Sequence, residues 1–490
     1  MKKYILYFMI VPCLLLTSCN KWLEIDPEDR VIEKNLFNSK EGFIVALNGI
    51  YIEMSSPDLY GGKMEATVID VMAQYYTYAM PSVHAYLDYA NFDYTQEGVK
   101  GSFATIWAKY YNLIINCNAI IEHCDEATGL LGDKYYNVIK GEALALRALF
   151  HFDLLRVWGP VYKENKKMEC LPYAESSKIE VRPLLPANEV YEKIKADLKA
   201  AESYLQKSDP IITEGALFSI GGYDGNDMRY RNLRMNYFAV QALLARVALY
   251  CDEKPLALEY ALKVIGEVHR EGNVMFPFVN RTGGDLEDRM YQTELLFAHY
   301  NLKRPDIYKN YFSNSLSNSN VLRVDDDLVE GMYEETDFRY KYQWSKLKNS
   351  SDVEQYYFMK YKPVELQNSE NKDEIIKKEY RYLVPMIRIS EMYYIAAECY
   401  DDPEQALFYL NEVRNARALK KLTDASLIPD ELEKEYKREF IGEGQLFFYY
   451  KRLGKEEIQY GNYSWDAVTM SSDKYVVPLP DAEKNNRISK

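Results

Sequence analysis

The sequence is poor in the residues and motifs from which most catalytic centres and metal sites are built. It contains only five His among 490 residues, and these are scattered without the spacing that metal ligands need. It has no H-E-x-x-H, no G-x-S-x-G, no P-loop and no G-x-G-x-x-G after a strand. Gly442-Glu443-Gly444 begins like the last of these, but Gln445-Leu446-Phe447 follows. We therefore predict no cofactor and no metal ion, and we interpret His151 as a structural residue.

Basic charge is also in short supply. The chain has 60 Lys and Arg against 74 Asp and Glu, a formal net charge of -14. A surface of that sign repels phosphate backbones instead of releasing their counterions, which argues against a nucleic-acid partner. Asp224-Gly225-Asn226-Asp227 offers oxygen ligands but lacks the length and the terminal Glu of a calcium loop, so we interpret it as a solvated turn. A pair of carboxylates suitably placed for glycoside hydrolysis remains open among so many acids.

Cysteine is present, but its arrangement fits neither a disulfide framework nor a metal site. Beyond the N-terminal segment there are five Cys, none in a C-x-x-C motif: Cys117, Cys124, Cys170, Cys251 and Cys399. Five cannot all pair, and Cys117 and Cys124 lie seven residues apart on one predicted helix face. That spacing is about 10 Å by helical rise, which is too far for a disulfide. We interpret the five as small buried hydrophobic residues.

Long apolar runs are missing except at the N-terminus. There, Lys2 and Lys3 precede an apolar stretch of 13 residues, 4–16, which is too short for a permanent membrane span and is typical of a signal peptide. We predict that residues 1–18 are removed. Leu16-Thr17-Ser18-Cys19 resembles the bacterial lipobox, so we predict that Cys19 is acylated and anchors the protein to a membrane without crossing it. The alternative is an ordinary signal peptide with an incidental Cys.

Two adjacent stretches carry the apolar periodicity of amphipathic helices. The first stripe is Phe103, Trp107, Tyr110, Ile114, Cys117, Ile121 and Cys124, and the second is Ile139, Ala143, Leu146, Phe150, Leu154 and Val157. Gly129 and Gly132 lie between the stripes, and Gly159-Pro160 ends the second. The two helices should pack antiparallel, with Phe150 buried between them.

A short pattern further along the chain occurs twice. Ala257-Leu258-x-Tyr260 with Val264 has the same offsets as Ala406-Leu407-x-Tyr409 with Val413, and each copy follows an apolar helix and a short acidic turn containing Pro. Small residues at close-packing positions of a repeated helical hairpin are typical of tetratricopeptide repeats. Chance similarity within a helix-rich chain is the alternative.

The segments between these helices are irregular and rich in aromatic rings. The chain has 45 Tyr beside 19 Phe and 5 Trp, and many rings fall within residues 58–101 and 272–385. The two densest groups are Tyr75, Tyr76, Tyr78, Tyr86, Tyr89, Phe92 and Tyr94, and then Tyr333, Phe338, Tyr340, Tyr342, Trp344, Tyr356, Tyr357, Phe358 and Tyr361. An exposed ring can stack on the apolar face of a sugar, and long insertions on a rigid scaffold are where recognition usually lies. The alternative is that these rings simply pack.

Several segments, in order along nearly the whole chain, resemble the SusD/RagB family of outer-membrane nutrient-uptake lipoproteins. They are Trp22-Leu23-Glu24-Ile25-Asp26-Pro27, Leu47-Asn48-Gly49-Ile50-Tyr51, Gly141-Glu142-Ala143-Leu144-Ala145-Leu146-Arg147, Trp158-Gly159-Pro160, Ile387-Arg388-Ile389-Ser390-Glu391, Leu410-Asn411-Glu412-Val413-Arg414, Arg438-Glu439-Phe440-x-x-Glu443-Gly444 and Val477-Pro478-Leu479-Pro480. One departure is Gln445-Leu446-Phe447, where the family often has an Arg and an Asp before its closing basic residues.

The resemblance implies an all-α protein with about four tetratricopeptide-like hairpins and long irregular insertions that form a ligand-binding face. It implies one domain over residues 19–490, with parts at about 19–230 and 231–490. It further implies a surface-exposed lipoprotein of the outer membrane that binds an oligosaccharide without catalysis and delivers it to a SusC-like TonB-dependent β-barrel transporter. Peptide binding by the same architecture is one alternative, and a surface hydrolase or pure scaffold is another.

The resemblance carries no ligand-binding motif, so the candidate binding residues come from the aromatic groups alone. We predict Trp344 first, because it has the largest apolar face and stands beside Tyr342 and Lys346 in the longest interruption of the repeats. The further candidates are Tyr75, Tyr76 and Tyr78. The alternative for Trp344 is that it packs beneath the insertion.

Overall fold

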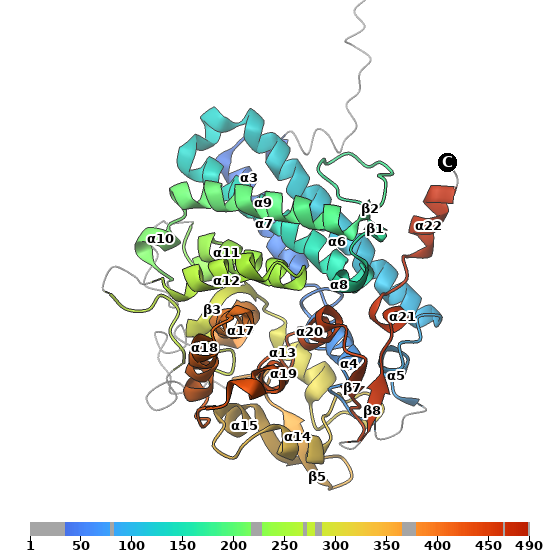
Figure 1. Cartoon of the computed structure of the whole chain (residues 1–490). Helices are drawn as coiled ribbons and strands as arrows, with labels where there is room; N and C mark the ends of the chain where they lie inside the picture. Colours follow the sequence, from blue (N-terminus) through green and yellow to red (C-terminus); the bar gives the residue numbers. More distant parts are fainter. Residues whose placement is uncertain are drawn as a thin grey trace, which may run out of the picture.

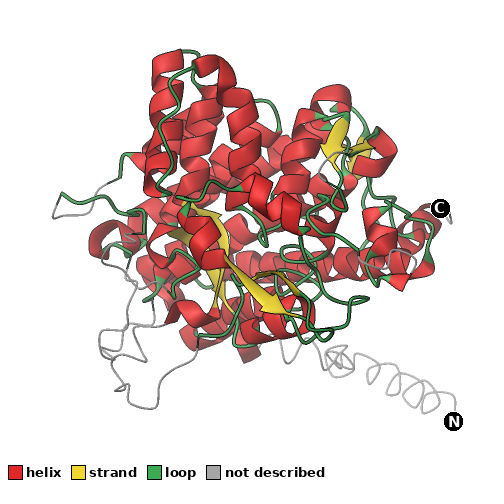
Figure 2. Cartoon of the chain, turned by 90° about the horizontal axis from the view of Figure 1, so that it is seen from below, coloured by secondary structure: helices red, strands yellow, loops and turns green. Residues whose placement is uncertain are grey.

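The computed structural model describes residues 35–78, 83–216, 228–267, 272–279, 287–364, 379–463 and 466–488. Helices make up most of this part of the chain, as predicted (Figure 1). The described residues also contain four antiparallel sheets of two strands each, which the prediction of an all-α fold did not include. Figure 2 shows these strands as short arrows among the helices.

The longer helices form a continuous stack along one side of the molecule. They are α3 (Lys40–Met54), α6 (Glu97–Glu126), α7 (Thr128–Trp158), α9 (Ala187–Ser208), α11 (Tyr237–Tyr250), α12 (Lys254–Ile265), α17 (Ile389–Cys399) and α18 (Pro403–Ala416). Each of these helices packs on the next one in the chain. Taken two by two in chain order, α3/α6, α7/α9, α11/α12 and α17/α18 are four packed helix pairs within the described residues, in agreement with the predicted repeat architecture.

The shorter elements lie at the ends of the stack and in the segments between its hairpins. The helices are α4 (Val68–Met72), α5 (Leu87–Ala90), α8 (Tyr162–Asn165), α10 (Ile211–Glu214), η3 (Arg231–Leu233), η4 (Gln292–Glu294), α13 (Arg304–Ile307), η5 (Tyr308–Phe312), α14 (Asp326–Met332), α15 (Phe338–Gln343), η6 (Glu379–Tyr382), η7 (Ala425–Leu427), α19 (Ile428–Glu439), α20 (Leu446–Leu453), α21 (Ser472–Tyr475) and α22 (Asp481–Ile488). The strands are β1 (Glu169–Leu171), β2 (Leu185–Pro186), β3 (Leu295–Tyr300), β4 (Trp344–Lys348), β5 (Glu354–Phe358), β6 (Leu383–Arg388), β7 (Glu457–Gln459) and β8 (Ala467–Thr469).

The α6/α7 hairpin matches the prediction from periodicity. Phe150 is fully buried, and its ring centroid lies 6.0 Å from that of Tyr110 on α6. His151 is structural, as predicted: its Nδ1–H donates to the Arg147 carbonyl at 2.9 Å, and its Nε2 accepts from the Ala174 N–H at 3.0 Å. Burial lowers the pKa of His151 to about 3. The five described Cys are buried and unpaired, also as predicted.

The two copies of the repeated pattern form the hairpins α11/α12 and α17/α18. In the second copy, the Asp402 side chain accepts the Glu404 N–H at 2.9 Å, and Pro403 starts α18. An N-cap carboxylate and a Pro in the first turn both favour a helix start at this point. The small residues Ala257 and Ala406 are buried, which allows the helices of each hairpin to approach closely.

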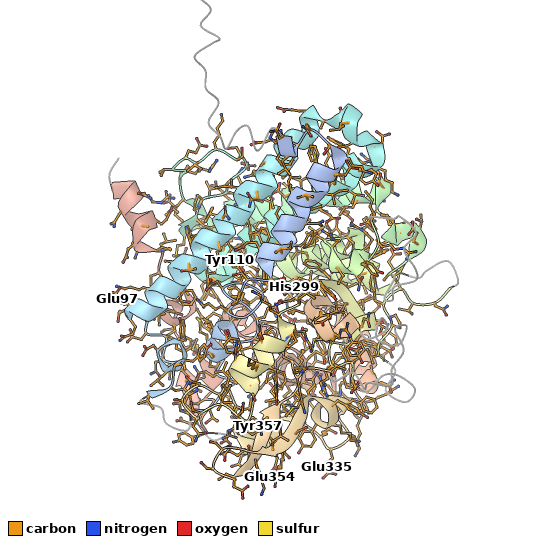
Figure 3. The ribbon with its side chains drawn as sticks, turned by 180° about the vertical axis from the view of Figure 1, so that it is seen from behind. Glu97, Tyr110, His299, Glu335, Glu354 and Tyr357 are labelled. Atoms are coloured by element: carbon orange, nitrogen blue, oxygen red, sulfur yellow. The ribbon has the colours of Figure 1, made fainter. Side chains whose placement is uncertain are left out.

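The insertion between these two hairpins is folded against the stack. β3 pairs with β6 in a register that runs from Leu295 opposite Arg388 to Tyr300 opposite Leu383. β4 pairs with β5 in a separate hairpin at the end of the molecule away from α6. In Figure 3, Tyr110 marks the stack, Tyr357 marks this distant hairpin, and His299 of β3 lies between them. The insertion therefore covers the end of the stack.

A buried network of arginines and acids joins the insertion to the last helices. Arg339 binds Glu435 at 2.7 Å, and Arg417 binds Glu294 at 2.6 Å and Glu439 at 2.6 Å. Arg388 also pairs with Glu439. Burial disfavours the charge of Glu439, but Arg417 and Arg388 together hold its pKa well below the usual range. Removing one partner would leave an uncompensated buried charge, which is strongly destabilising.

Candidate functional site

Three of the predicted binding residues lie in the interior. Tyr75, Tyr76 and Tyr78 are 1%, 0% and 3% exposed. The Tyr75 hydroxyl donates to the Lys437 carbonyl at 2.9 Å, and the Tyr76 hydroxyl donates to the Ala66 carbonyl at 3.0 Å. These rings hold the segment around α4 to the rest of the core. They present no face on which a sugar could stack, so the prediction is wrong for them.

Trp344 also packs beneath the insertion, as the alternative interpretation had it. It is 4% exposed, and its ring centroid lies 5.2 Å from Phe358 and 6.2 Å from Tyr333. Trp344 lies opposite Phe358 in the β4/β5 register and is buried, whereas Lys346, on the same face two residues further along the strand, is exposed and pairs with Glu330 at 3.1 Å. Tyr342, on the preceding helix, is half-buried. Trp344 is therefore a core residue, and the prediction that it stacks on a sugar is wrong; the assignment of Tyr342 stays a prediction.

A different part of the first aromatic group lies at the surface. Tyr86 and Tyr89, on either side of the start of α5, are half-buried, and their ring centroids are 6.1 Å apart. Tyr311 of the insertion is also half-buried, and its hydroxyl is near enough to that of Tyr86 to add to the effect of burial in raising the pKa of Tyr86. We call these three rings, Tyr86, Tyr89 and Tyr311, the aromatic face.

His84 fastens the aromatic face to the insertion. Its ring is buried, its Nδ1 accepts the Tyr86 N–H at 3.2 Å, and its Nε2–H donates to the Val321 carbonyl at 3.2 Å. The buried Tyr78 ring meets it edge-on at 4.6 Å between centroids. Burial lowers the pKa of His84, so the ring is neutral at neutral pH and can accept one hydrogen bond while it donates the other. The hydrogen bond therefore fixes the backbone of Tyr86, whose ring centroid lies 6.2 Å from that of His84.

A loop rich in hydroxyl and amide groups lies next to the aromatic face. Residues 313–320 read Ser-Asn-Ser-Leu-Ser-Asn-Ser-Asn, and we call them the Ser/Asn loop. The Ala85 N–H donates to the Ser319 carbonyl at 3.0 Å, which ties the loop to the segment that carries Tyr86. Within the loop, Ser317 Oγ lies 3.0 Å from Ser319 Oγ and 3.1 Å from Asn320 Nδ2. Because Ser317, Asn318 and Asn320 are exposed, the loop offers both donors and acceptors to a ligand.

The segment between β7 and β8 borders the same region, and the sequence analysis missed it. Asn462 Oδ1 accepts the Tyr78 N–H at 2.7 Å and the Thr77 hydroxyl at 3.1 Å. Tyr463 is 48% exposed, and its ring lies 6.0 Å from that of Tyr460. The only signal in the sequence is the pair of Tyr around Gly461-Asn462, which is too short to distinguish a binding loop from an ordinary turn. In Figure 1 this hairpin and α5 lie on the same side of the molecule.

A tight contact holds the base of this region in place. Asp70 of α4 is fully buried and accepts the N–H groups of Gly442 at 2.5 Å and Gly444 at 3.1 Å. A Cβ on Gly444 would lie 2.1 Å from the Met64 carbonyl oxygen, and the φ of Gly444 is +64°. The sequence that begins like a nucleotide-binding motif is therefore a turn that lets the C-terminal helices approach the segment carrying the aromatic face.

A groove of about 610 Å³ lies beside the α17/α18 hairpin. The buried residues Ala397, Ala406 and Leu432 line it together with Tyr400 and Tyr449. Two of the acids that line it are in ion pairs: Glu398 makes a bidentate pair with Arg452 at 2.7 Å, and Glu433 binds Lys455 at 2.6 Å. The described lining of this groove includes buried apolar side chains but no loop rich in exposed hydroxyl and amide groups like the one beside the aromatic face.

The described ranges contain neither a cluster of metal ligands nor a membrane-spanning helix. No group of three or more His, Cys, Asp or Glu in them could hold a metal ion. Among the helices assigned there, none combines the length and the apolar character needed to cross a bilayer. The predicted anchor, Cys19, lies outside the described residues.

The fold and this face together define a protein of stacked helical hairpins with a candidate binding site on the adjoining loops. Two family models match the chain in succession: "Starch-binding associating with outer membrane" over residues 21–212, and "SusD family" over residues 222–487. The second alone covers more than half of the chain, so the chain belongs to the SusD family. Proteins of this family bind ligands and are not enzymes.

Two curated relatives come from Formosa agariphila. SusD-like protein P2 is 26% identical over 218 residues, and SusD-like protein P38 is 27% identical over 214 residues. Each match covers 42% of this chain, but only 38% of P2 and 39% of P38. The match therefore spans well under two thirds of either relative's length.

Solved structures match over most of the chain. A SusD superfamily protein from Bacteroides thetaiotaomicron has a TM-score of 0.68 at 20% identity and covers 91% of this chain and 98% of its own. A putative sugar binding protein from Bacteroides vulgatus has a TM-score of 0.67 at 23% identity, with coverages of 91% and 96%. Surface glycan-binding protein A from Bacteroides thetaiotaomicron, solved with laminarihexaose, has a TM-score of 0.65 at 17% identity, with coverages of 92% and 98%. These likenesses establish the shared fold.

Proposed function

We propose that this protein is a surface-exposed glycan-binding lipoprotein of the outer membrane. It captures an oligosaccharide on the aromatic face and delivers it to a SusC-like TonB-dependent transporter. The observation that carries the proposal is the pairing of half-exposed rings with the Ser/Asn loop, since sugar recognition requires an apolar surface together with a few well-placed polar groups. Membership of the SusD family supports it, as does the fold shared with a protein solved in complex with laminarihexaose.

The orientation of the ring matters for this role. The backbone of Tyr86 is bonded to His84, and its ring lies between those of His84 at 6.2 Å and Tyr89 at 6.1 Å, so little conformational freedom is lost when a sugar stacks on it. A pre-organised ring contributes more to affinity than a mobile one because the entropy of ordering is not lost on binding. We therefore assign the main stacking contact to Tyr86.

The membrane part of the proposal rests on the N-terminal sequence and on the family. Residues 1–18 have the features of a signal peptide, and Cys19 follows the lipobox-like Leu16-Thr17-Ser18. A chain anchored by more than one acyl group at Cys19 would be held stably at the membrane. Delivery to a transporter in the same membrane is what the resemblance to the SusD/RagB family implies.

Calorimetric titration with defined oligosaccharides tests the binding function. The probes are laminarihexaose, maltohexaose, xylohexaose and mannohexaose, and we expect the mature protein to bind at least one. Tyr86→Ala should weaken that binding by about 2 kcal/mol or more. The matched control is Tyr409→Ala, which removes a half-buried ring from α18 and should leave affinity unchanged.

Each alternative function predicts a different result in the same experiment. Binding of short peptides with no response to any of the four hexaoses would replace the proposal with a peptide-binding function. Release of shorter saccharides by the pure protein, detected by mass spectrometry, would identify a hydrolase. If Tyr86→Ala and Tyr409→Ala lose the same amount of affinity for the oligosaccharide, the aromatic face is not the binding site.

A further inference from the structure

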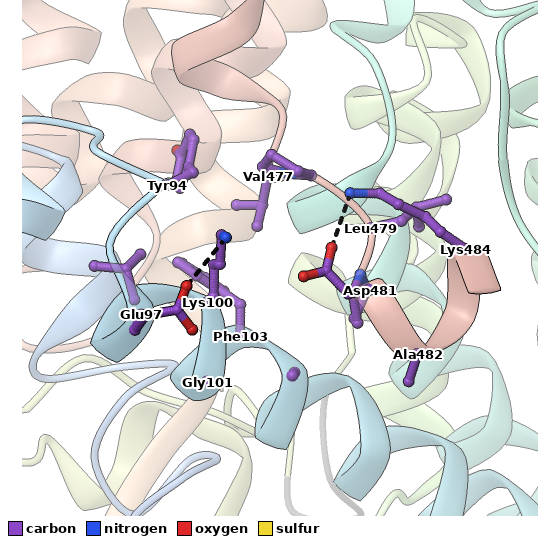
Figure 4. Close-up of a pocket in the computed structure, with 14 residues that line it drawn as sticks. Tyr94, Glu97, Lys100, Gly101, Phe103, Val477, Leu479, Asp481, Ala482 and Lys484 are labelled. Carbon is purple, nitrogen blue, oxygen red and sulfur yellow. Dashed lines mark hydrogen bonds and ion pairs between the residues drawn. The ribbon is translucent and has the colours of Figure 1, made fainter.

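A small cavity lies where the start of α6 meets the C-terminal tail (Figure 4). Its volume is about 250 Å³, below the roughly 300–1,000 Å³ of sites for drug-sized ligands, so it suits a single ring and not a chain. Tyr94, Val99 and Phe103 line one side, and Val477 and Leu479 line the other. Most of its wall is therefore apolar, with two aromatic rings on one side.

Two ion pairs stand on opposite sides of the cavity (Figure 4). Lys100 lies 3.3 Å from Glu97, and Lys484 lies 3.5 Å from Asp481. All four side chains are exposed, and pairs of this kind contribute little to stability, so they can exchange partners with a ligand at small cost. Two carboxylates and two ammonium groups offer both acceptors and donors and carry no net charge. That chemistry fits the hydroxyl groups of an uncharged sugar and gives no preference for an anionic one.

A continuous path of ring contacts joins this cavity to the aromatic face. Tyr86 contacts Tyr89 at 6.1 Å between centroids, Tyr89 contacts Phe103 at 6.1 Å, and Phe103 contacts Tyr94 at 5.9 Å. Tyr94 is itself half-buried, and its hydroxyl donates to the Lys474 carbonyl at 2.6 Å. The ring is thus fixed at the edge of the cavity. The cavity lies no more than three such ring contacts from Tyr86, a separation that a short oligosaccharide can span.

We propose that this cavity is a second saccharide subsite, which receives a terminal neutral sugar ring of an oligosaccharide whose other rings lie on the aromatic face. The proposal rests on the glycan-binding function proposed above and adds to it a preference for chain length. A ligand too short to reach from Tyr86 to the cavity gains nothing from the subsite. A longer ligand gains from both contacts, which act as one linked binding event.

A cavity-filling variant on α6 tests the subsite. Ala104 lines the cavity, so Ala104→Phe should occupy the space that the sugar ring needs. Ala108→Phe adds the same ring one turn further along the same helix, at an exposed position that does not line the cavity. The probe is whichever of laminarihexaose, maltohexaose, xylohexaose and mannohexaose binds the wild-type protein, together with the trisaccharide of the same linkage.

We expect Ala104→Phe to weaken hexasaccharide binding about tenfold and to leave trisaccharide binding unchanged. Ala108→Phe should change neither. Asp481→Asn provides a second variant if Ala104→Phe does not fold, as judged by circular dichroism, and it should also weaken only the hexasaccharide. The subsite is overturned if the hexasaccharide binds these variants with wild-type affinity, or if both ligands are weakened equally.

The outcome also separates this proposal from the proposed function. If wild-type protein binds none of the four hexaoses, both are overturned. If a hexaose binds and Tyr86→Ala abolishes its binding while Ala104→Phe does not affect it, the glycan-binding face stands and only the second subsite fails. If Ala104→Phe prevents the binding of a hydrophobic peptide but changes the affinity for no saccharide, the cavity is a protein contact instead.

Discussion

Replacing Gly444 by Ala tests the contact that holds the base of the aromatic face. The left-handed φ of +64° costs Ala about 1–2 kcal/mol. The new Cβ would also lie 2.1 Å from the Met64 carbonyl oxygen, and because that atom belongs to the backbone, no side-chain rotation relieves the clash. The turn must move away, which leaves the buried Asp70 short of hydrogen bonds at a cost of about 1–3 kcal/mol. We expect a total loss of roughly 2–5 kcal/mol in the free energy of unfolding.

Two other glycines separate the contributions. Gly132 has a φ of +63° and a ψ of 165°, a conformation that is nearly restricted to Gly, but open space where its Cβ would be, so Gly132→Ala should cost only the conformational part, about 1–3 kcal/mol. Gly49 lies within α3 with nothing within 4 Å, so Gly49→Ala should stabilise by about 0.5–1 kcal/mol. Urea denaturation of the three variants gives the ranking directly. The reasoning is refuted if Gly444→Ala loses no more stability than Gly132→Ala.

Three further predictions follow from packing, titration and processing. Trp344→Ala should cost about 3–5 kcal/mol of stability with unchanged affinity for the oligosaccharide, measured by denaturation and titration of one sample; lost affinity with full stability would restore Trp344 as a binding residue. Burial lowers the pKa of His299 to about 4. As the pH falls, the imidazole is therefore protonated in the unfolded chain before it is protonated in the folded protein. The free energy of unfolding, which keeps its full value above about pH 6.5, should fall by about 3 kcal/mol as the pH drops to 4. The variant His299→Gln should show a correspondingly smaller loss over this range, and an equal loss would contradict the assignment. Cys19→Ala should leave the fold intact and release the protein from the outer membrane in cells that lack the transporter; retention of this variant in the membrane fraction would disprove the anchor.

The helical stack could be predicted because its signals are local. Apolar residues at spacings of three and four defined α6 and α7, and the same offsets in two places defined the hairpins that contain Tyr260 and Tyr409. Helix periodicity depends only on neighbours within a few turns. Phe150 and His151 therefore fell where the pattern placed them.

The binding face could not be predicted in the same way, because burial of its rings depends on contacts distant in sequence. Trp344 is buried by its pairing with Phe358 and by the insertion folding over it. Tyr75 is held by the carbonyl of Lys437, 362 residues away. The sequence shows where aromatic rings are dense, but tertiary packing decides which of these rings face solvent. Of the first group, Tyr86 and Tyr89 are the half-exposed rings that form the aromatic face with Tyr311.

The position of a bound oligosaccharide tests the central claim most directly. A crystal structure of the protein with the hexaose that it binds in solution should show a sugar ring stacked on Tyr86, with hydroxyl groups directed to the Ser/Asn loop. Saccharide density over the last hairpin, in the groove between Tyr400 and Tyr449, with none at Tyr86, would contradict the account.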